Sequence, residues 1–308
     1  AYFNEELNEW IPLSSTVNPT TGTVTALVDH FTLFALISFT DLSKEDTVEG
    51  DTGQILGSSV GVYPNGSLLK APSSSAIWYI AGDDKHLIKS AHIFESKFNW
   101  DDIIDLPSSL QLDLYATGAD VKFATGTLVK EQGNSSVYRV SVNGGVQPIL
   151  SEEIFNERAY DFKNMIELEE GSLALYPEQS YIQDSERLYS GDLVKIADNS
   201  AVYFVDADRA RLIPSASIFK ENAYKSYAIR EIKEEQFDSL SEGLDVIYQD
   251  GTLVKGDSSA IYVISNARKM PILSGADFEA LLYNWNKVVY VPDVILASIN
   301  NAPALQVI

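Results

Sequence analysis

Gly126-Thr127-Leu128-Val129-Lys130 is a short motif that occurs four times in this chain, and it decides how the chain is organised. Its counterparts are Gly66-Ser67-Leu68-Leu69-Lys70, Gly191-Asp192-Leu193-Val194-Lys195 and Gly251-Thr252-Leu253-Val254-Lys255. The four lysines stand 60, 65 and 60 residues apart. Self-similarity at a nearly fixed period is the signature of a repeat architecture. The sequence therefore predicts four tandem modules of about sixty residues each.

Four further landmarks follow each motif in the same order. An apolar residue with an aromatic one directly after it comes first, then a serine, then a phenylalanine four positions beyond the serine, and last another aromatic residue. The first aromatics are Trp78, Tyr138, Tyr203 and Tyr262, and the serines are Ser90, Ser151, Ser215 and Ser274. The phenylalanines are Phe94, Phe155, Phe219 and Phe278, and the last aromatics are Trp100, Phe162, Tyr227 and Trp285. Chance does not produce this order four times.

Each landmark has a local structural interpretation. The Leu-Val-Lys stretch and the aromatic stretch after it are short, alternating and separated by polar turns such as 133–135, which is typical of a hairpin. A third strand such as 147–149 precedes the serine, which stands where a helix N-cap is expected. A brief helix then buries the phenylalanine, and a fourth strand such as 103–106 follows. The predicted fold class is α+β and strand-dominated, with three strands, a short helix and a strand in each module.

The expected domain limits follow from the repeat. An N-terminal β segment with an acidic linker covers 1–54, and the modules cover 55–120, 121–184, 185–247 and 248–308. Sixty residues lie near the lower limit for an independent core, so we expect the modules to pack on one another. A linear or gently curved array and a small β-propeller both satisfy this expectation. The recurrent helix between the third and fourth strands favours the array.

Composition and charge restrict the class of protein. The 308 residues carry 22 basic and 44 acidic side chains, a formal net charge of -22, and a surface this acidic disfavours nucleic-acid binding. The absence of cysteine excludes disulfides, iron–sulfur clusters and thiolate metal sites. No signal peptide is visible in the opening residues, and the most apolar stretch, 24–39, is too short and too polar to span a bilayer. Low pI without cysteine is typical of prokaryotic cell-surface proteins.

Residues 1–40 do not match the repeat. This strand-rich segment resembles the closing strands of a β-sandwich found in large prokaryotic surface proteins, in which a tryptophan-led segment is followed by a His-Phe-Ser/Thr strand. Its strands are too few to form a sandwich, and exposed strands with aromatic faces invite pairing. We therefore expect them to complete a sheet of upstream sequence or of a neighbouring subunit by strand addition. The residues of this expected assembly strand are Val24, Val28, Phe31 and Leu33.

The tripeptide His30-Phe31-Thr32 also resembles the cleavage site of autoproteolytic sandwich domains. The resemblance implies that the hydroxyl of Thr32 attacks the preceding carbonyl, with His30 as the base. The alternative is an ordinary strand, which we favour because the sequence runs unbroken past the site.

The search for chemistry yields no catalytic, cofactor-binding or metal-binding residue. Acidic pairs such as Asp83-Asp84 lack the spacing of a calcium loop, so we interpret them as solvated charge. What recurs in the modules are residue types of turns, strands, caps and cores, so we expect that the chain is not an enzyme. The repeated lysines form either a ligand-binding row or the cover of a strand edge, the second being favoured. Two sequons, at Asn65 and Asn134, permit N-glycosylation in a secreted protein.

The module resembles a tandem repeat of large bacterial and archaeal extracellular proteins, over residues 56–308. Phe162 and Tyr227 replace the last tryptophan of that repeat in the second and third modules, which implies looser packing there. The resemblance implies a surface location and a structural role as a surface-layer, filament or stalk subunit. The expected partner is then the chain itself or another surface protein, and no cofactor is expected. The alternative function is a cell-surface adhesin or glycan-binding module, with Trp78, Trp100 and Trp285 as sugar platforms.

Overall fold

The computed structural model describes residues 2–4, 9–11, 15–18, 23–26 and 63–305. The chain divides into two compact units, Ala1–Leu56 and Gly57–Ile308. In the first unit, β1 (Tyr2–Asn4) pairs antiparallel with β2 (Glu9–Ile11), and β3 (Ser15–Asn18) pairs antiparallel with β4 (Thr23–Ala26). Val24 lies in β4 opposite Val17. The other residues of the expected assembly strand, Val28, Phe31 and Leu33, and the tripeptide 30–32 lie outside the described residues.

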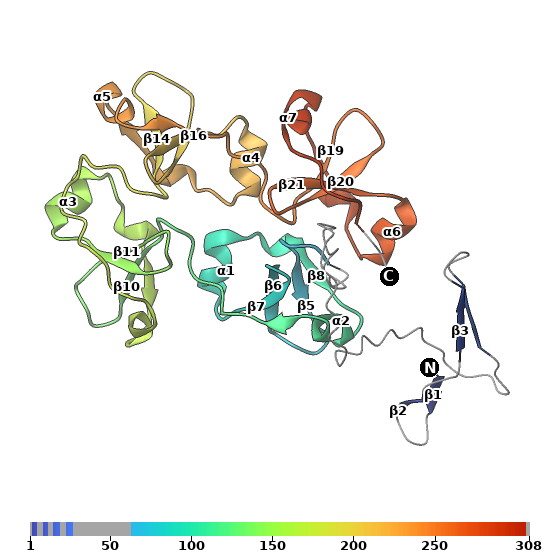
Figure 1. The fold of residues 1–308 in the computed structure, drawn as a ribbon. Helices are drawn as coiled ribbons and strands as arrows, with labels where there is room; N and C mark the ends of the chain where they lie inside the picture. Colours follow the sequence, from blue (N-terminus) through green and yellow to red (C-terminus); the bar gives the residue numbers. More distant parts are fainter. Residues whose placement is uncertain (1, 5–8, 12–14, 19–22, 27–62, 306–308) are drawn as a thin grey trace, which may run out of the picture. The chain divides into compact units, whose positions relative to one another are not determined.

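The second unit contains four modules, and Figure 1 shows each as a small sheet with short helices beside it. The first module comprises β5 (Leu68–Lys70), β6 (Ile77–Ala81), β7 (Asp84–Ile88), α1 (Ala91–Lys97), η1 (Trp100–Asp102), β8 (Ile103–Asp105), α2 (Leu110–Asp113) and β9 (Ala116–Thr117). The second comprises β10 (Leu128–Glu131), β11 (Tyr138–Val140), β12 (Val146–Pro148), α3 (Glu152–Glu157), η2 (Phe162–Asn164), β13 (Ile166–Leu168) and η3 (Ser172–Leu175).

The third and fourth modules repeat this order. The third comprises β14 (Leu193–Ile196), β15 (Tyr203–Asp206), β16 (Arg209–Leu212), α4 (Ala216–Glu221), η4 (Ser226–Ala228), β17 (Ile229–Ile232), α5 (Glu234–Phe237) and β18 (Ser241–Glu242). The fourth comprises β19 (Leu253–Lys255), β20 (Ile261–Ser265), β21 (Arg268–Ile272), α6 (Gly275–Ala280), η5 (Trp285–Lys287), β22 (Val289–Tyr290) and α7 (Asp293–Ser298). The predicted strand-dominated α+β fold of repeated modules is confirmed.

All four sheets share one topology. The first strand of each module pairs antiparallel with the second and parallel with the fourth, as in the order β8-β5-β6-β7-β9. The helix supplies the crossover that a parallel fourth strand requires. These parallel fourth strands differ from the antiparallel sheets of a propeller blade.

The serine of each module is the N-cap of its helix. The hydroxyls of Ser90, Ser151, Ser215 and Ser274 accept hydrogen bonds of 3.0–3.3 Å from the backbone N–H three residues later. The phenylalanine that follows is buried in the first, second and fourth modules, and the last aromatic residue stacks on it with ring centroids 4.0–4.1 Å apart. Phe162 stacks as the tryptophans do, so the expectation of looser packing was wrong for the second module. In the third module Phe219 contacts Tyr224, a contact that Phe155 and Phe278 also make with the tyrosine five residues later.

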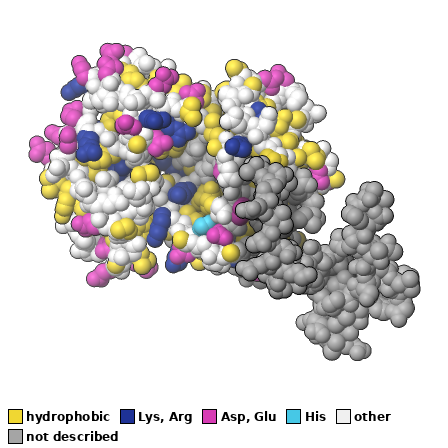
Figure 2. All heavy atoms as spheres, in the orientation of Figure 1, with side chains coloured by type: hydrophobic (Ala, Val, Ile, Leu, Met, Phe, Trp, Pro, Cys, Tyr) yellow, Lys and Arg dark blue, Asp and Glu magenta, His cyan; other side chains and the backbone are white. Residues whose placement is uncertain are grey.

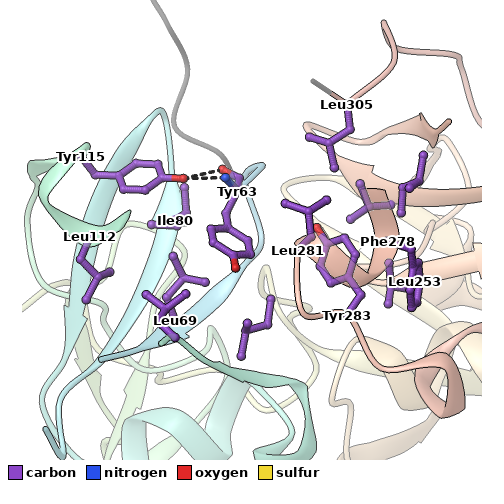
Figure 3. Close-up of a cluster of buried hydrophobic side chains, with 14 residues drawn as sticks. Tyr63, Leu69, Ile80, Leu112, Tyr115, Leu253, Phe278, Leu281, Tyr283 and Leu305 are labelled. Atoms are coloured by element: carbon purple, nitrogen blue, oxygen red, sulfur yellow. Dashed lines mark hydrogen bonds between the residues drawn. The ribbon is translucent and has the colours of Figure 1, made fainter. Parts of the chain in front are cut away.

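The modules do not form a linear array, because the first and the fourth share a core. Tyr63, Leu69 and Ile80 of the first module belong to one buried cluster with residues of the fourth, among them Leu253, Phe278 and Tyr283 (Figure 3). A second cluster joins the first and second modules, and a third joins the third and fourth. The preference for an array was therefore wrong. Each module is too small to bury its apolar faces alone, and the last module covers the face that the first would otherwise expose.

The glycine that opens the repeated motif has a role at these junctions. Gly66 and Gly251 have φ of +101° and +93°, and a Cβ atom on Gly66 would lie 2.0 Å from the carbonyl carbon of Asp250. The first and fourth modules therefore meet backbone to backbone at two glycines. Gly126 and Gly191 approach each other in the same manner between the second and third modules.

Candidate functional site: a central cavity and a buried ion cluster

A cavity of about 710 Å³ lies where the four modules meet. Equivalent positions in three modules supply part of its wall, since Tyr79, Arg139 and Phe204 each occupy the third place of the apolar–aromatic stretch that forms the second strand. The fourth module contributes Gln249. On the face shown in Figure 2, Lys and Arg side chains gather around a hollow between the modules, while many Asp and Glu side chains lie on its outer rim.

The lining of the cavity is aromatic and charged. Six aromatic side chains contribute to it: Tyr79, Phe98, Tyr160, Phe204, Tyr224 and Tyr227. The charged side chains are those of Lys97, Arg139, Lys225 and Arg230, and those of Glu95, Asp161 and Asp192. Burial raises the pKa values of Tyr79 and Tyr224 to about 12, so both phenols are neutral hydrogen-bonding groups at physiological pH. Ligand-binding cavities combine apolar walls with a few polar groups in this way.

Asp192 holds three arginines at the edge of this cavity. Its Oδ1 accepts from Nη2 of Arg139 at 2.9 Å, and its Oδ2 accepts from Nη2 of Arg158 at 2.9 Å and from Nη1 of Arg230 at 3.3 Å. The backbone N–H of Tyr189 donates to Oδ2 at 2.9 Å as well. We call these four side chains, of Asp192, Arg139, Arg158 and Arg230, the ion cluster. It joins the second module to the third.

The ion cluster is almost completely buried, with side-chain exposures of 3% for Asp192, 1% for Arg139, 0% for Arg158 and 9% for Arg230. Burial alone would raise the pKa of Asp192, but the three guanidinium groups outweigh it and hold that pKa below its usual value. Burial lowers the pKa of Arg230, and the positive charge of Arg158 acts in the same direction. Asp192 therefore stays ionised, and the cluster carries a net charge of 3 − 1 = +2.

One donor of the ion cluster has no partner. Nη2 of Arg139 donates to Asp192 and to the carbonyl oxygen of Ser190, whereas Nη1 is buried and has no hydrogen-bond partner within the described part of the chain. Arg158 differs, because its Nη1 reaches the carbonyl oxygen of Arg187 at 2.7 Å and its Nε reaches the hydroxyl of Tyr160 at 2.8 Å. A buried unpaired donor is costly, and this one belongs to Arg139, whose side chain contributes to the lining of the cavity.

The repeated lysines lie outside the cavity. Lys70, Lys130 and Lys195 each form an ion pair with an acidic residue on the parallel fourth strand, Asp105, Glu167 and Glu231 respectively, at 2.8–3.5 Å. The strand register sets these pairs, since Lys70 stands opposite Asp105 and Lys195 opposite Glu231. The side chains of all three pairs are partly solvent-exposed, so each pair contributes little to stability.

The repeated aromatics have mainly structural positions. Trp78, Tyr138, Tyr203 and Tyr262 are half-buried on the second strand of each sheet, and Trp78 packs against the core shared by the first and fourth modules. Trp100 and Trp285, the other two expected sugar platforms, are 47% and 49% exposed. Each uses one face of its indole ring to stack on a buried phenylalanine, Phe94 or Phe278.

The two sequons differ in access. Asn134 lies in the polar turn between β10 and β11 and is partly exposed. Asn65 is buried, and its Nδ2 donates to Oδ1 of Asn266 in the fourth module at 2.9 Å. A glycan on Asn65 would therefore be incompatible with this junction, whereas Asn134 offers an accessible amide. Among the described residues, no group of three or more acidic or histidine side chains is arranged to hold a metal ion. No helix within residues 63–305 is long and apolar enough to cross a membrane.

Sequence reasoning missed the ion cluster, although the repeat itself contains the signal. Asp192 occupies the second place of the glycine motif, where the other modules have Ser67, Thr127 and Thr252. Arg139 occupies the third place of the second-strand stretch, where the others have Tyr79, Phe204 and Val263. Arg230 pairs with Val194 at the position of Ile104, Ile166 and Val289 in the other sheets. These charged residues stand where the repeat has hydroxyl, aromatic or apolar ones.

The similarity of this chain to known proteins is low. No protein-family model matches the chain, and no curated protein matches it. Among solved structures, the periplasmic assembly from the ESX-5 inner membrane complex is similar at 14% sequence identity and a TM-score of 0.18, over 79% of this chain and 67% of that one. An intact ESX-5 inner membrane complex is similar at the same identity and TM-score, and the match covers 58% of that chain.

Proposed function

We propose that residues 57–308 are a non-catalytic binding module of the cell exterior, which holds a small organic ligand or the end of a polymer in the central cavity. The observation that carries this proposal is the cavity itself, about 710 Å³ with aromatic walls and walls supplied by all four modules. Contacts between the first and fourth modules close the repeat on itself, because buried residues of both modules belong to one core. The closed arrangement of the modules therefore offers the cavity as a candidate binding site.

The state of Asp192 supports binding over catalysis. A general base works best when its pKa lies near the operating pH. The pKa of Asp192 is shifted downward, away from neutrality, and four hydrogen bonds already engage its oxygens. This carboxylate acts as a structural anion.

A neutral aromatic dye tests whether the cavity takes a ligand. We expect N-phenyl-naphthylamine to bind the full chain saturably, because the aromatic walls exclude water from the dye. Ala228→Trp adds a large side chain at an exposed residue of the cavity wall and should abolish this binding. The matched control is Ala260→Trp, at an exposed residue outside the cavity. Fluorescence titration gives the result, and unchanged binding in Ala228→Trp would overturn the proposal.

A second candidate function is assembly through residues 1–40, and the two N-terminal hairpins favour it. β1 pairs with β2 and β3 with β4 as separate two-stranded sheets in the described part of this unit. An isolated hairpin is marginally stable in water and gains stability by joining a larger sheet. Self-association as a surface-layer, filament or stalk subunit would use this segment.

Deletion of residues 1–40 tests this second function. We expect ordered polymers of the native protein in electron microscopy and monomers of the truncated chain, because the truncation removes the strands that would pair with a neighbour. The thermal unfolding of residues 57–308 should stay unchanged in the truncated chain, which serves as the control for folding. Polymers of unchanged order after the deletion would exclude the segment as the assembly element.

A further inference from the structure

The central cavity has the opposite charge balance from the chain as a whole. Acidic residues outnumber basic ones by 44 to 22 in the sequence. Around the cavity four cationic side chains stand against three carboxylates, and Arg158 of the ion cluster adds a further positive charge behind the wall. The two carboxylates other than Asp192 make contacts of their own, since Glu95 accepts from the indole N–H of Trp100 and Asp161 accepts from the backbone N–H of Lys163.

The ion cluster contains more guanidinium groups than carboxylates, and its other hydrogen-bond acceptors, such as the carbonyl oxygens of Ser185 and Ser190, carry no full negative charge. One carboxylate serves three guanidinium groups, and both of its oxygens are engaged. Arginine keeps its charge in proteins, so the excess cannot be relieved by loss of a proton. Two positive charges thus remain buried beside the cavity, and Arg139 Nη1 has no partner within residues 63–305.

We propose that the central cavity binds an organic oxyanion, a ligand with a carboxylate, sulfate, sulfonate or phosphate group, which accepts hydrogen bonds from Arg139 and faces Arg230. This inference rests on the proposed binding function and names the chemistry of its ligand. An oxyanion satisfies the unpaired donor and neutralises the excess charge in a single contact, and guanidinium groups recognise oxyanions by charge-assisted hydrogen bonds.

The size and walls of the cavity indicate that the oxyanion belongs to an organic body. A volume of about 710 Å³ is far larger than an inorganic anion needs. The lining of the cavity includes the aromatic rings of Phe98, Phe204 and Tyr224. The rings of Phe204 and Tyr224 stack on each other with centroids 5.5 Å apart. Such surface suits the ring of an aromatic or sugar acid.

A pair of dyes that differ in one group tests the proposal. Anilinonaphthalene sulfonate has the aromatic body of N-phenyl-naphthylamine plus a sulfonate. We expect the sulfonate to bind about tenfold tighter or more than the neutral dye, because a charge-assisted hydrogen bond in a buried site is worth about one such factor. Glucuronate and inorganic sulfate should displace it, while glucose and chloride at equal ionic strength should not. Displacement by glucuronate but not by sulfate assigns the preferred group as a carboxylate, and the reverse assigns a sulfate.

Two variants separate the site from general charge effects. Arg139→Gln should remove the preference for the sulfonate while the neutral dye still binds. Lys195→Gln removes one positive charge outside the cavity and should leave the preference unchanged. If Arg139→Gln loses its fold, protection of the native protein against thermal unfolding by glucuronate, compared with glucose at equal ionic strength, gives the answer independently. Equal affinity for the two dyes in the native protein would overturn the oxyanion while leaving the binding function intact, and failure of both dyes would overturn both.

Discussion

Replacing Asp192 by asparagine should lower the free energy of unfolding by about 3–5 kcal/mol, as expected when one partner of a buried ion pair is removed. The side chain of Asp192 is 3% exposed, and its carboxylate forms ion pairs with Arg139, Arg158 and Arg230. An amide at this position keeps the shape but leaves three buried positive charges uncompensated. Urea denaturation of the full chain measures the change in the unfolding of residues 57–308.

The matched control is Asp105→Asn, which also converts a carboxylate into an amide within an ion pair. Asp105 pairs with Lys70, but its side chain is 78% exposed, so the change should stay within about 0.5 kcal/mol. Equal losses in the two variants would show that the ion cluster does not hold the second and third modules together.

The difference in unfolding free energy between the native protein and Asp192→Asn should also depend on pH, which gives an independent check. The folded-state pKa of Asp192 is depressed, so its contribution to stability is fully present above the pKa of the unfolded chain, about 3.9 for aspartate, and is lost as the pH falls through the folded value. The stability difference between the native protein and Asp192→Asn should therefore be largest at neutral pH and shrink below about pH 4. A difference that stays constant down to acidic pH would contradict this account.

Substitutions in the ion cluster can also distinguish its contribution to folding stability from its contribution to ligand binding. At its four positions the fourth module has Thr252, Val263, Leu281 and Val289. Replacing all four residues of the ion cluster by their counterparts from the fourth module should recover most of the stability that Asp192→Asn loses. A buried ion cluster can often be replaced by apolar residues without loss of stability. The same exchange removes the guanidinium groups that we propose to bind an oxyanion. The native chain has the ion cluster at the junction of the second and third modules but not at the junction of the first and fourth. This difference is consistent with a role of the cluster beyond folding.

The local structure of each module was predictable because it depends on neighbours in sequence. The hydroxyl of Ser90 caps a helix through an amide three residues away, and Phe94 packs under Trp100 within the same module. Spacing alone contains this information. The repeat also indicated that the modules would need to cover one another.

The arrangement of modules and the site could not be predicted, because both depend on contacts between residues that are 34 to 201 positions apart in the sequence. The hydrogen bond between Asn65 and Asn266 spans 201 residues, and that between Arg139 and Asp192 spans 53. A motif that begins with glycine predicts a turn, but it predicts the same turn in an open array and in a closed unit. The charged residues at 139, 192 and 230 break the repeat, but the sequence does not show that these breaks meet.

Gly66→Ala should disrupt the closure between the first and fourth modules, with a loss of about 2–5 kcal/mol. A side chain at φ +101° costs about 1–2 kcal/mol by itself. Steric overlap adds about 1–3 kcal/mol, since the new Cβ atom would lie 2.0 Å from the carbonyl carbon of Asp250, and backbone atoms cannot move aside as a flexible side chain can. Gly251→Ala should behave alike, because its Cβ atom would lie 2.3 Å from the carbonyl oxygen of Gly66.

Gly133→Ala isolates the conformational part of this loss. Gly133 has a similar φ of +75°, but nothing lies within 4 Å of a Cβ atom built there. Its replacement should therefore cost only the strain of about 1–2 kcal/mol. The additional loss in Gly66→Ala measures the contact between the modules, and hydrogen exchange should locate it at the amides of Leu281, Tyr283 and Leu305, which belong to the core shared by the two modules. Identical losses at Gly66 and Gly133, with those amides still protected, would mean that the chain tolerates an open arrangement. The cavity, to which the fourth module contributes Gln249, would then have to form without the closure.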